Sequence, residues 1–243
     1  MRVCDQKHLK GEIFIILRDF EKLPEYMQTD ETKVYYEILK KRKNSILIKR
    51  IFDFVFSLIL CVLLLPIILL VAIVIVIDSP GNPLFLQTRI TKYGKKFKIF
   101  KFRTMVTNAE KLGTQVTRDN DPRITKVGKY LRKLRIDEIP QIFNILLGDL
   151  SFVGVRPEVP KYVKKYTDEM YATLLMPAGV TSLTSILYKN EAELLKSSKK
   201  TDETYINKIL PEKMKYNLEY IKNFNFFGDI KIMFKTLKAV ASK

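Results

Sequence analysis

FVFSLILCVLLLPIILLVAIVIVI, residues 54–77, contains no charged side chain, and the rest of the chain is organised around this stretch. As a straight helix it would be about 36 Å long. This length is enough to cross a bilayer core of about 30 Å. Helices of soluble proteins are seldom apolar on every side over such a length. The stretch therefore predicts a membrane helix.

Two features favour a re-entrant membrane helix over a simple crossing. Pro66 lies in the middle of the stretch, where a proline removes a backbone donor and clashes with the preceding turn, so we expect a kink or break there. Both flanks, residues 40–50 and 89–98, are basic, and the positive-inside bias would hold both on the cytoplasmic side. The alternative is one kinked span with a translocated basic domain, because long domains can cross regardless of charge.

The composition limits the classes of partner. The chain has 243 residues and a net charge of +17, an excess that attracts anionic lipids, phosphate-bearing substrates or nucleic acid. Two cysteines and one histidine exclude a disulfide framework and make a zinc cluster improbable. No secretory signal is recognised at the start.

The patterns predict a mostly helical α+β fold in three parts. Residues 1–45 form an N-terminal extension of unknown role, in which residues 32–43 have helical spacing. Residues 46–82 form the membrane helix, and residues 83–243 form a small cytoplasmic domain. Within that domain, residues 230–238 predict a C-terminal amphipathic helix with one apolar and one basic face, which suits the membrane interface or packing on its own domain.

Residues 84–104 predict a β-hairpin with a turn at Tyr93-Gly94. Side chains alternate along a strand, so the pattern places Arg89, Lys101 and Arg103 at one end of a short sheet. A solvated basic strand face is the alternative.

An acidic pair precedes a second helix. Pro140 suits the first position of a helix that ends at Gly148. Asp137 and Glu138 then lie at or just before its N-terminus. Acidic residues there commonly stabilise the helix dipole, so position alone does not distinguish catalysis from that role.

The segments that follow give weaker patterns. Residues 149–160 predict a tight loop, in which Arg156 between a glycine and Pro157 suits a fixed fork for phosphate. Residues 183–188 suggest a strand, and residues 190–195 suggest a capped helix start.

Several motifs occur in a consistent order over about residues 49–240, and together they resemble the bacterial sugar transferases. These are monotopic phosphoglycosyl transferases that start glycan assembly on a polyprenyl-phosphate carrier. The motifs are Lys49-Arg50-Ile51-Phe52-Asp53, Phe85-x-Gln87-x-Arg89, Phe97-Lys98-Ile99-Phe100-Lys101-Phe102-Arg103-Thr104-Met105, Arg135-x-Asp137-Glu138-x-Pro140-Gln141, and Asn144-x-Leu146-x-Gly148-Asp149-x-Ser151-Phe152-Val153-Gly154-x-Arg156-Pro157.

Two departures from the family pattern stand out. Leu65 precedes Pro66 where the family often has serine, and residues 176–182 replace a Pro-Gly-Ile-Thr-Gly stretch. The second departure bears on recognition of the sugar and the base.

The resemblance implies a reaction and its residues. Asp137 would attack the β-phosphate of a UDP-sugar, expel UMP and hold the phosphosugar until polyprenyl (undecaprenyl) phosphate accepts it. Glu138 would orient or assist. Mg²⁺ would be bound by Asp137 and the diphosphate, and the substrate by Arg156, Pro157 and some of Arg89, Lys101 and Arg103.

The resemblance also implies a setting for the reaction. It places the protein on the cytoplasmic face of the bacterial plasma membrane, in contact with lipid. The reaction would be the first membrane step of a surface glycan such as an exopolysaccharide or lipopolysaccharide. A homodimer is left open.

Two other functions could be suggested by parts of the sequence. A basic, membrane-anchored protein could bind nucleic acid or acidic lipid without catalysis, but the sequence has no RNA-binding aromatic signature, zinc finger or helix-turn-helix pattern. We therefore expect no nucleic-acid partner. A P-loop NTPase requires a glycine-rich spacing that neither Lys95-Lys96 nor Lys129 follows.

Overall fold

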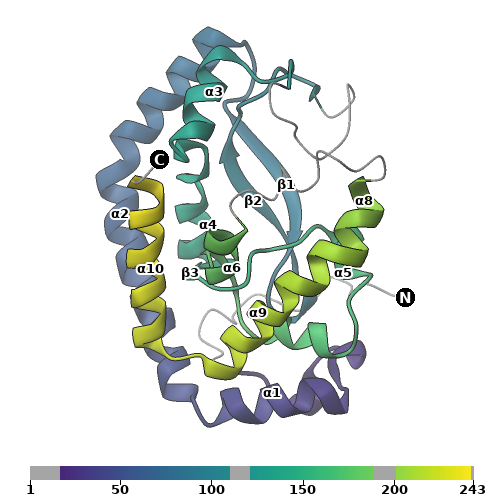
Figure 1. Cartoon of the computed structure of the whole chain (residues 1–243). Coiled ribbons are helices and arrows are strands. Elements are labelled where there is room, and N and C mark those ends of the chain that lie inside the picture. The colour runs from purple at the N-terminus through teal and green to yellow at the C-terminus, as the bar shows by residue number, and fades with distance from the viewer. Residues whose placement is uncertain (1–16, 110–120, 189–200, 242–243) are drawn as a thin grey trace.

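The computed structural model describes residues 17–109, 121–188 and 201–241. Within them, helices dominate and the strands form two small two-stranded sheets, which confirms the mostly helical α+β class. Helix α2 (Lys43–Asp78) runs along one side of the molecule with α10 (Phe226–Ala241) beside it (Figure 1). A β-hairpin lies centrally, α1 (Asp30–Lys40) crosses the bottom of the view and leads into α2, and α9 (Leu210–Asn223) runs obliquely on the side away from α2.

Helix α2 continues through Pro66, so the described helix is not broken at the proline. Its buried residues repeat at spacings of three, four or seven, which places them on one face toward the rest of the protein. Its other sides are open, and Val62 is 68% and Ile77 78% exposed. Within the described residues, α2 is the one helix long and apolar enough to cross a membrane. The re-entrant arrangement stays a prediction. The buried residues are Ile46, Lys49, Asp53, Ser57, Cys61, Ile68 and Ile75.

Charged residues fasten the first turns of α2 to the domain. The Lys49 ammonium donates to the carbonyl of Val153 at 2.7 Å and pairs with Asp229 of α10 at 2.5 Å. Asp53 accepts from the backbone N–H of Phe152 at 3.2 Å. Lys49 is only 4% exposed. This flanking cation is therefore an internal anchor and does not face lipid headgroups.

The hairpin forms as predicted, from β1 (Leu84–Ile90) and β2 (Lys96–Phe102). The turn places Tyr93 at φ 56° and Gly94 at φ 74°. The register pairs Arg89 with Phe97 and Lys101 with Phe85. Arg89 and Lys101 therefore share a face but lie at opposite ends of the ladder, which corrects the expectation that they converge at one end.

The predicted loop after α4 (Gln141–Leu147) begins with a strand. Residues of β3 (Leu150–Val153) pair in parallel with β4 (Ala178–Thr181). The strand was missed because it has four residues and is followed at once by turn-forming glycine and proline. Gly154 and Gly179 meet so closely that a Cβ on Gly179 would lie 2.1 Å from the Gly154 nitrogen. The two glycines thus permit this pairing.

Residues 183–188, predicted as a strand, instead begin with helix α6 (Leu183–Leu187). The Ser182 hydroxyl accepts from the N–H of Ser185 at 2.9 Å and so caps this helix. The predicted helix start at residues 190–195 lies outside the described residues. The remaining α-helices of the described residues are α3 (Lys126–Lys133), α5 (Pro160–Val163) and α8 (Thr201–Thr204), with a π-helical turn, Tyr205–Ile209, between α8 and α9.

The described part of the N-terminal extension belongs to the main core. Helix α1 forms as predicted, and its Tyr36 and Leu39 pack in one cluster with Tyr171 and with Ile221 of α9. At the other end of the chain, α10 packs on α2 and β3 but leaves Phe227 76% exposed. The predicted packing of the C-terminal helix on its own domain is therefore confirmed, and its contact with the membrane interface stays a prediction.

Candidate active site

Asp137 and Glu138 lie on one 3-10 turn, Ile136–Glu138, between α3 and α4. Arg135 enters this turn in the left-handed conformation, at φ 59°. Pro140 is the N-cap of α4, in agreement with the predicted helix start. The local sequence thus places two consecutive carboxyl groups beside β2, which the turn contacts.

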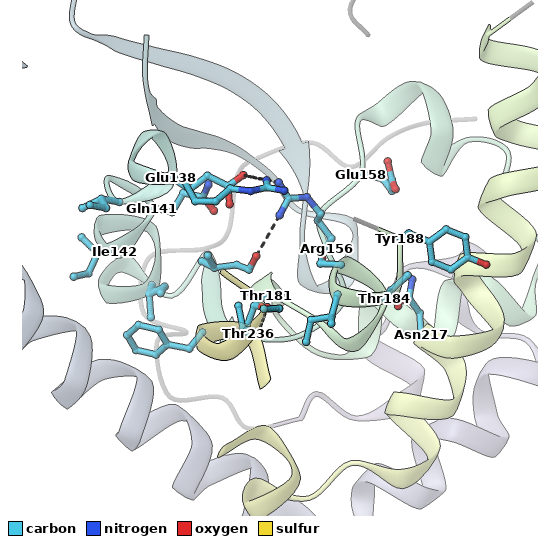
Figure 2. A pocket seen from close by; sticks show the side chains of 18 of the residues that line it. Glu138, Gln141, Ile142, Arg156, Glu158, Thr181, Thr184, Tyr188, Asn217 and Thr236 are labelled. Atoms are coloured by element: carbon cyan, nitrogen blue, oxygen red, sulfur yellow. Dashed lines mark hydrogen bonds and ion pairs between the residues drawn. The ribbon is translucent and has the colours of Figure 1, made fainter. Parts of the chain in front are cut away.

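Glu138 holds two cations. Its Oε1 atom accepts from the Arg156 guanidinium at 2.7 Å, the pair shown in Figure 2, and from the Lys101 ammonium at 3.0 Å. Burial would raise the pKa of Glu138, but Arg156 and Lys101 hold it well below its usual range. Glu138 is therefore an anion at neutral pH and anchors both cations.

The neighbouring carboxyl group of Asp137 has a different environment. Its Oδ1 atom is buried and has no hydrogen-bond partner among the described residues. Burial, with the charge of Glu138, raises the pKa of Asp137, and Lys101 opposes this rise. A desolvated carboxylate that is not held by hydrogen bonds is suited to act as a nucleophile or a metal ligand.

Arg156 is fixed from two sides. One guanidinium nitrogen donates to Glu138, and the other donates to the carbonyl of Val180 in β4 at 3.2 Å. Its side chain is still 35% exposed. Arg89 supports the same segment, because it donates to the carbonyl of the buried Pro157 at 3.1 Å. Pro157 therefore shapes this segment, and Arg156 presents the charge.

Arg103 has another position. Its guanidinium donates to the carbonyls of Ser79 and Pro80 and to the Thr107 hydroxyl, at the end of α2. The structure thus brings Lys101 and Arg156 to Glu138 and places Arg89 against the carbonyl of Pro157. Arg103 instead binds the end of the apolar helix α2.

A cavity of about 480 Å³ opens beside Glu138 and Arg156 (Figure 2). One side is apolar and comes from α2, α4 and α10, including Leu60, Leu64 and Ile142. Its volume is within the usual range of small-molecule sites, about 300–1,000 Å³. Asp137, Lys101 and Arg89 are not among its lining residues, so the cavity begins at the Glu138–Arg156 pair.

The other side of the cavity is lined by a cluster of buried polar side chains that the sequence did not predict. The Tyr205 hydroxyl donates to Oε1 of Glu158 at 2.5 Å, and the Lys213 ammonium donates to the Tyr205 hydroxyl at 3.1 Å. Nearby, the Thr184 hydroxyl donates to the Asn217 side-chain oxygen at 2.6 Å. One sequence signal was present, since Lys213 and Asn217 share a helix face with otherwise apolar neighbours.

Fixed cations and a desolvated carboxylate beside an apolar helix suit chemistry on a phosphate group at a membrane. Residues 44–243 match the family described as bacterial sugar transferase. The chain belongs to this family.

Three relatives illustrate the family. A UDP-N-acetylgalactosamine-undecaprenyl-phosphate N-acetylgalactosaminephosphotransferase of Aeromonas hydrophila is 38% identical over 79% of this chain and 43% of the relative. A UDP-glucose:undecaprenyl-phosphate glucose-1-phosphate transferase of Escherichia coli is 34% identical over 79% of this chain and 39% of the relative. An undecaprenyl-phosphate galactose phosphotransferase of Salmonella typhimurium is 29% identical over 93% of this chain and 48% of the relative. The match thus spans less than half the length of each relative.

Proposed function

We propose that this chain transfers a sugar phosphate from a UDP-sugar to undecaprenyl phosphate at the cytoplasmic face of the bacterial plasma membrane. The names of the relatives support this general reaction. The observation that carries the proposal is the difference between two consecutive carboxyl groups. Glu138 anchors two cations, whereas the Oδ1 atom of Asp137 is buried without a hydrogen bond.

The transfer has two steps. A carboxylate oxygen of Asp137 attacks the β-phosphorus, a P–O bond forms, and the bond from that phosphorus to the bridging oxygen breaks. UMP leaves with the electron pair, and the phosphosugar remains on Asp137 as an acyl phosphate. A phosphate oxygen of the carrier then attacks the same phosphorus, which frees the Asp137 carboxylate and gives undecaprenyl diphosphosugar.

Arg156 and Lys101 neutralise the phosphate charge in both steps. Glu138 holds both groups close together before substrate arrives, so they need little reorganisation during the reaction. The planar guanidinium of Arg156 provides a fork for two phosphate oxygens, whereas the Lys101 ammonium acts as a point charge. Glu138 thus acts through the cations that it positions.

The carboxyl environment of Asp137 also fits Mg²⁺. No group of three or more histidine, cysteine, aspartate or glutamate side chains able to hold a metal occurs among the described residues. Mg²⁺ usually binds through one or two carboxylates together with substrate phosphates and water. The buried, unpartnered Oδ1 of Asp137 can supply the carboxylate ligand, and the ion would neutralise charge on the diphosphate.

The exposed apolar sides of α2 and α10 support a site at a membrane. Val62 and Ile77 of α2 and Phe227 of α10 are each more than two-thirds exposed. Such a surface is costly in water and favourable against lipid. A re-entrant α2 would keep the active site at the headgroup plane, where the carrier phosphate lies.

Release of UMP tests the reaction. Purified protein is incubated with Mg²⁺ and UDP-N-acetylgalactosamine, UDP-glucose or UDP-galactose, with and without undecaprenyl phosphate. Sustained UMP release from at least one donor should require the carrier. Release at the same steady rate without the carrier would identify a hydrolase and contradict the transfer.

A further inference from the structure

The polar side of the cavity has no role in the transfer steps, yet it is built from buried charged and polar groups. Glu158 is 8%, Lys213 7% and Asn217 5% exposed. Burying such groups costs free energy unless they are well paired. Their presence beside a cavity therefore indicates either that they bind a ligand or that they have a structural role.

The contacts in this cluster leave part of Glu158 available. Both Tyr205 and Lys213 approach the same carboxylate oxygen, Oε1, at 2.5 Å and 3.7 Å. Oε2 has no hydrogen bond from the described residues, and Glu158 lines the cavity. The Tyr205 end of the cluster lies on the π-helical turn, a rare conformation that is frequent at functional sites.

The spacing of Arg156 and Glu158 along the chain suits a sugar ring. Arg156 precedes Pro157, which favours an extended backbone, and Glu158 follows two residues after Arg156. Two extended residues span about 6–7 Å. In a UDP-sugar, the hexose is attached directly to the phosphate that is attacked, whereas the nucleoside lies one phosphate farther away.

The relatives supply an independent reason for such a site. Their names give N-acetylgalactosamine, glucose and galactose as the transferred sugars, with the same kind of carrier. Groups that handle only phosphate cannot distinguish these sugars. A family of this kind therefore requires a second set of residues that contacts hydroxyl or acetamido groups.

We propose that Glu158, held by Tyr205 and Lys213, forms with Thr184 and Asn217 the site that recognises the sugar of the donor. A carboxylate accepts hydrogen bonds from neighbouring hydroxyl groups, and the hydroxyl and amide groups of Thr184 and Asn217 both donate and accept. The apolar side opposite, from α2 and α4, packs against the carbon face of the ring. This inference rests on the proposed transfer reaction and deepens it.

Donor selectivity tests the proposal. Glu158→Gln keeps the shape but removes the charge, and Thr184→Val removes a hydroxyl from the cavity without changing any charge. Asp202→Asn is the matched control. Asp202 binds a tyrosine and a lysine, Tyr162 and Lys161, as Glu158 does, but it does not line the cavity. Circular dichroism melting establishes that each variant folds.

The measurements are kcat/KM for UDP-N-acetylgalactosamine, UDP-glucose and UDP-galactose, the KM for undecaprenyl phosphate, and the inhibition constant of UDP, which lacks the sugar. We expect Glu158→Gln and Thr184→Val to lower kcat/KM for the preferred donor roughly tenfold and to change the ratios among donors. The inhibition constant of UDP should change less than about twofold, because UDP lacks the sugar that these residues would contact. A change of that size is no larger than the effect of an ordinary surface substitution. Asp202→Asn should leave the donor ratios unchanged.

Three results would overturn the sugar site. Unchanged donor ratios in both folded variants would leave the cluster with a structural role alone. An equal weakening of UDP binding would assign it to the nucleotide, and a rise confined to the carrier KM would assign the cavity to the lipid. Wild-type protein that releases no UMP from any donor would instead contradict the transfer reaction itself.

Discussion

Asp137 and Glu138 are consecutive residues of one 3-10 turn, yet the pKa values of their carboxyl groups are displaced in opposite directions. Both carboxyl groups are half-buried, and the partial loss of water alone would raise both pKa values. The difference arises because Lys101 and Arg156 both hydrogen-bond to Glu138, whereas Oδ1 of Asp137 has no such partner within the described chain. One carboxyl thus fixes charge, and the other is left reactive.

This difference predicts the pH dependence of the first step. The reactive anion of Asp137 is present above its raised pKa and is lost as the pH falls through that value. Glu138 raises the pKa of Asp137 and Lys101 lowers it. Glu138→Gln should therefore move the acid limb of the UMP burst to lower pH, and Lys101→Met should move it to higher pH. Rapid-quench rates between about pH 4 and 8 measure both shifts. Shifts in the same direction would contradict the role of Asp137 as the titrating group.

Arg156→Lys tests the phosphate fork. Lysine keeps the charge but loses the planar pair of donors that contact Glu138 and Val180. We expect kcat/KM for the donor to fall by about tenfold or more, because charge-assisted contacts contribute about 1.5–3 kcal/mol. Lys161→Arg, at the surface, serves as the control. Unchanged kinetics in folded Arg156→Lys and Arg156→Ala proteins would remove Arg156 from the site.

Asn144 joins α4 to the hairpin and predicts a stability effect. Its side chain accepts from the N–H of Phe100 at 2.9 Å and donates to the carbonyl of Lys98 at 2.8 Å, and it is fully buried. Asn144→Leu should lower the free energy of unfolding by about 2–4 kcal/mol, since two buried backbone groups lose their partners. Denaturant titration in detergent measures this change. Asn225→Leu, which removes two exposed contacts, to Gly228 and Asn223, should cost about 1 kcal/mol or less, because water can replace both partners. Equal losses in the two variants would contradict the bridging role.

The position of α2 in the membrane is testable by cysteine accessibility. In protein lacking Cys4 and Cys61, Asn44→Cys and Lys96→Cys place exposed thiols on either side of the apolar stretch. A re-entrant helix predicts that an impermeant reagent labels neither thiol in intact cells and both in inverted vesicles. Labelling of one site from outside would show that α2 spans the bilayer.

Local patterns in the sequence predicted much of the site. Alternation gave the hairpin, and Pro140 with Gly148 gave α4, so Asp137 and Glu138 were placed at its start. These features depend on residues near one another in the chain. The sequence predicted that Arg103 would lie with Lys101, but the Arg103 guanidinium binds the end of α2 instead. Nothing in the local pattern of the hairpin indicates this contact.

Longer-range features were not predictable from such patterns. The strand β3 has four residues and gains its partner β4 only through the close approach of Gly154 and Gly179. Glu158 meets Tyr205 across 47 residues of sequence, and the contact depends on how the π-helical turn Tyr205–Ile209 packs. Pairings of this kind depend on tertiary packing between distant segments. Local patterns in a single sequence do not predict such packing.

The central claim is that Asp137 carries the phosphosugar. The most direct measurement is intact-protein mass spectrometry, followed by peptide mapping, after incubation with Mg²⁺ and each UDP-sugar in the absence of undecaprenyl phosphate. The wild-type protein should release UMP in a burst and gain the mass of one phosphosugar on the peptide that contains Asp137. Asp137→Asn, which keeps the shape but removes the nucleophile, should show neither burst nor adduct. An adduct that persists in Asp137→Asn, or that maps to another residue, would contradict the account.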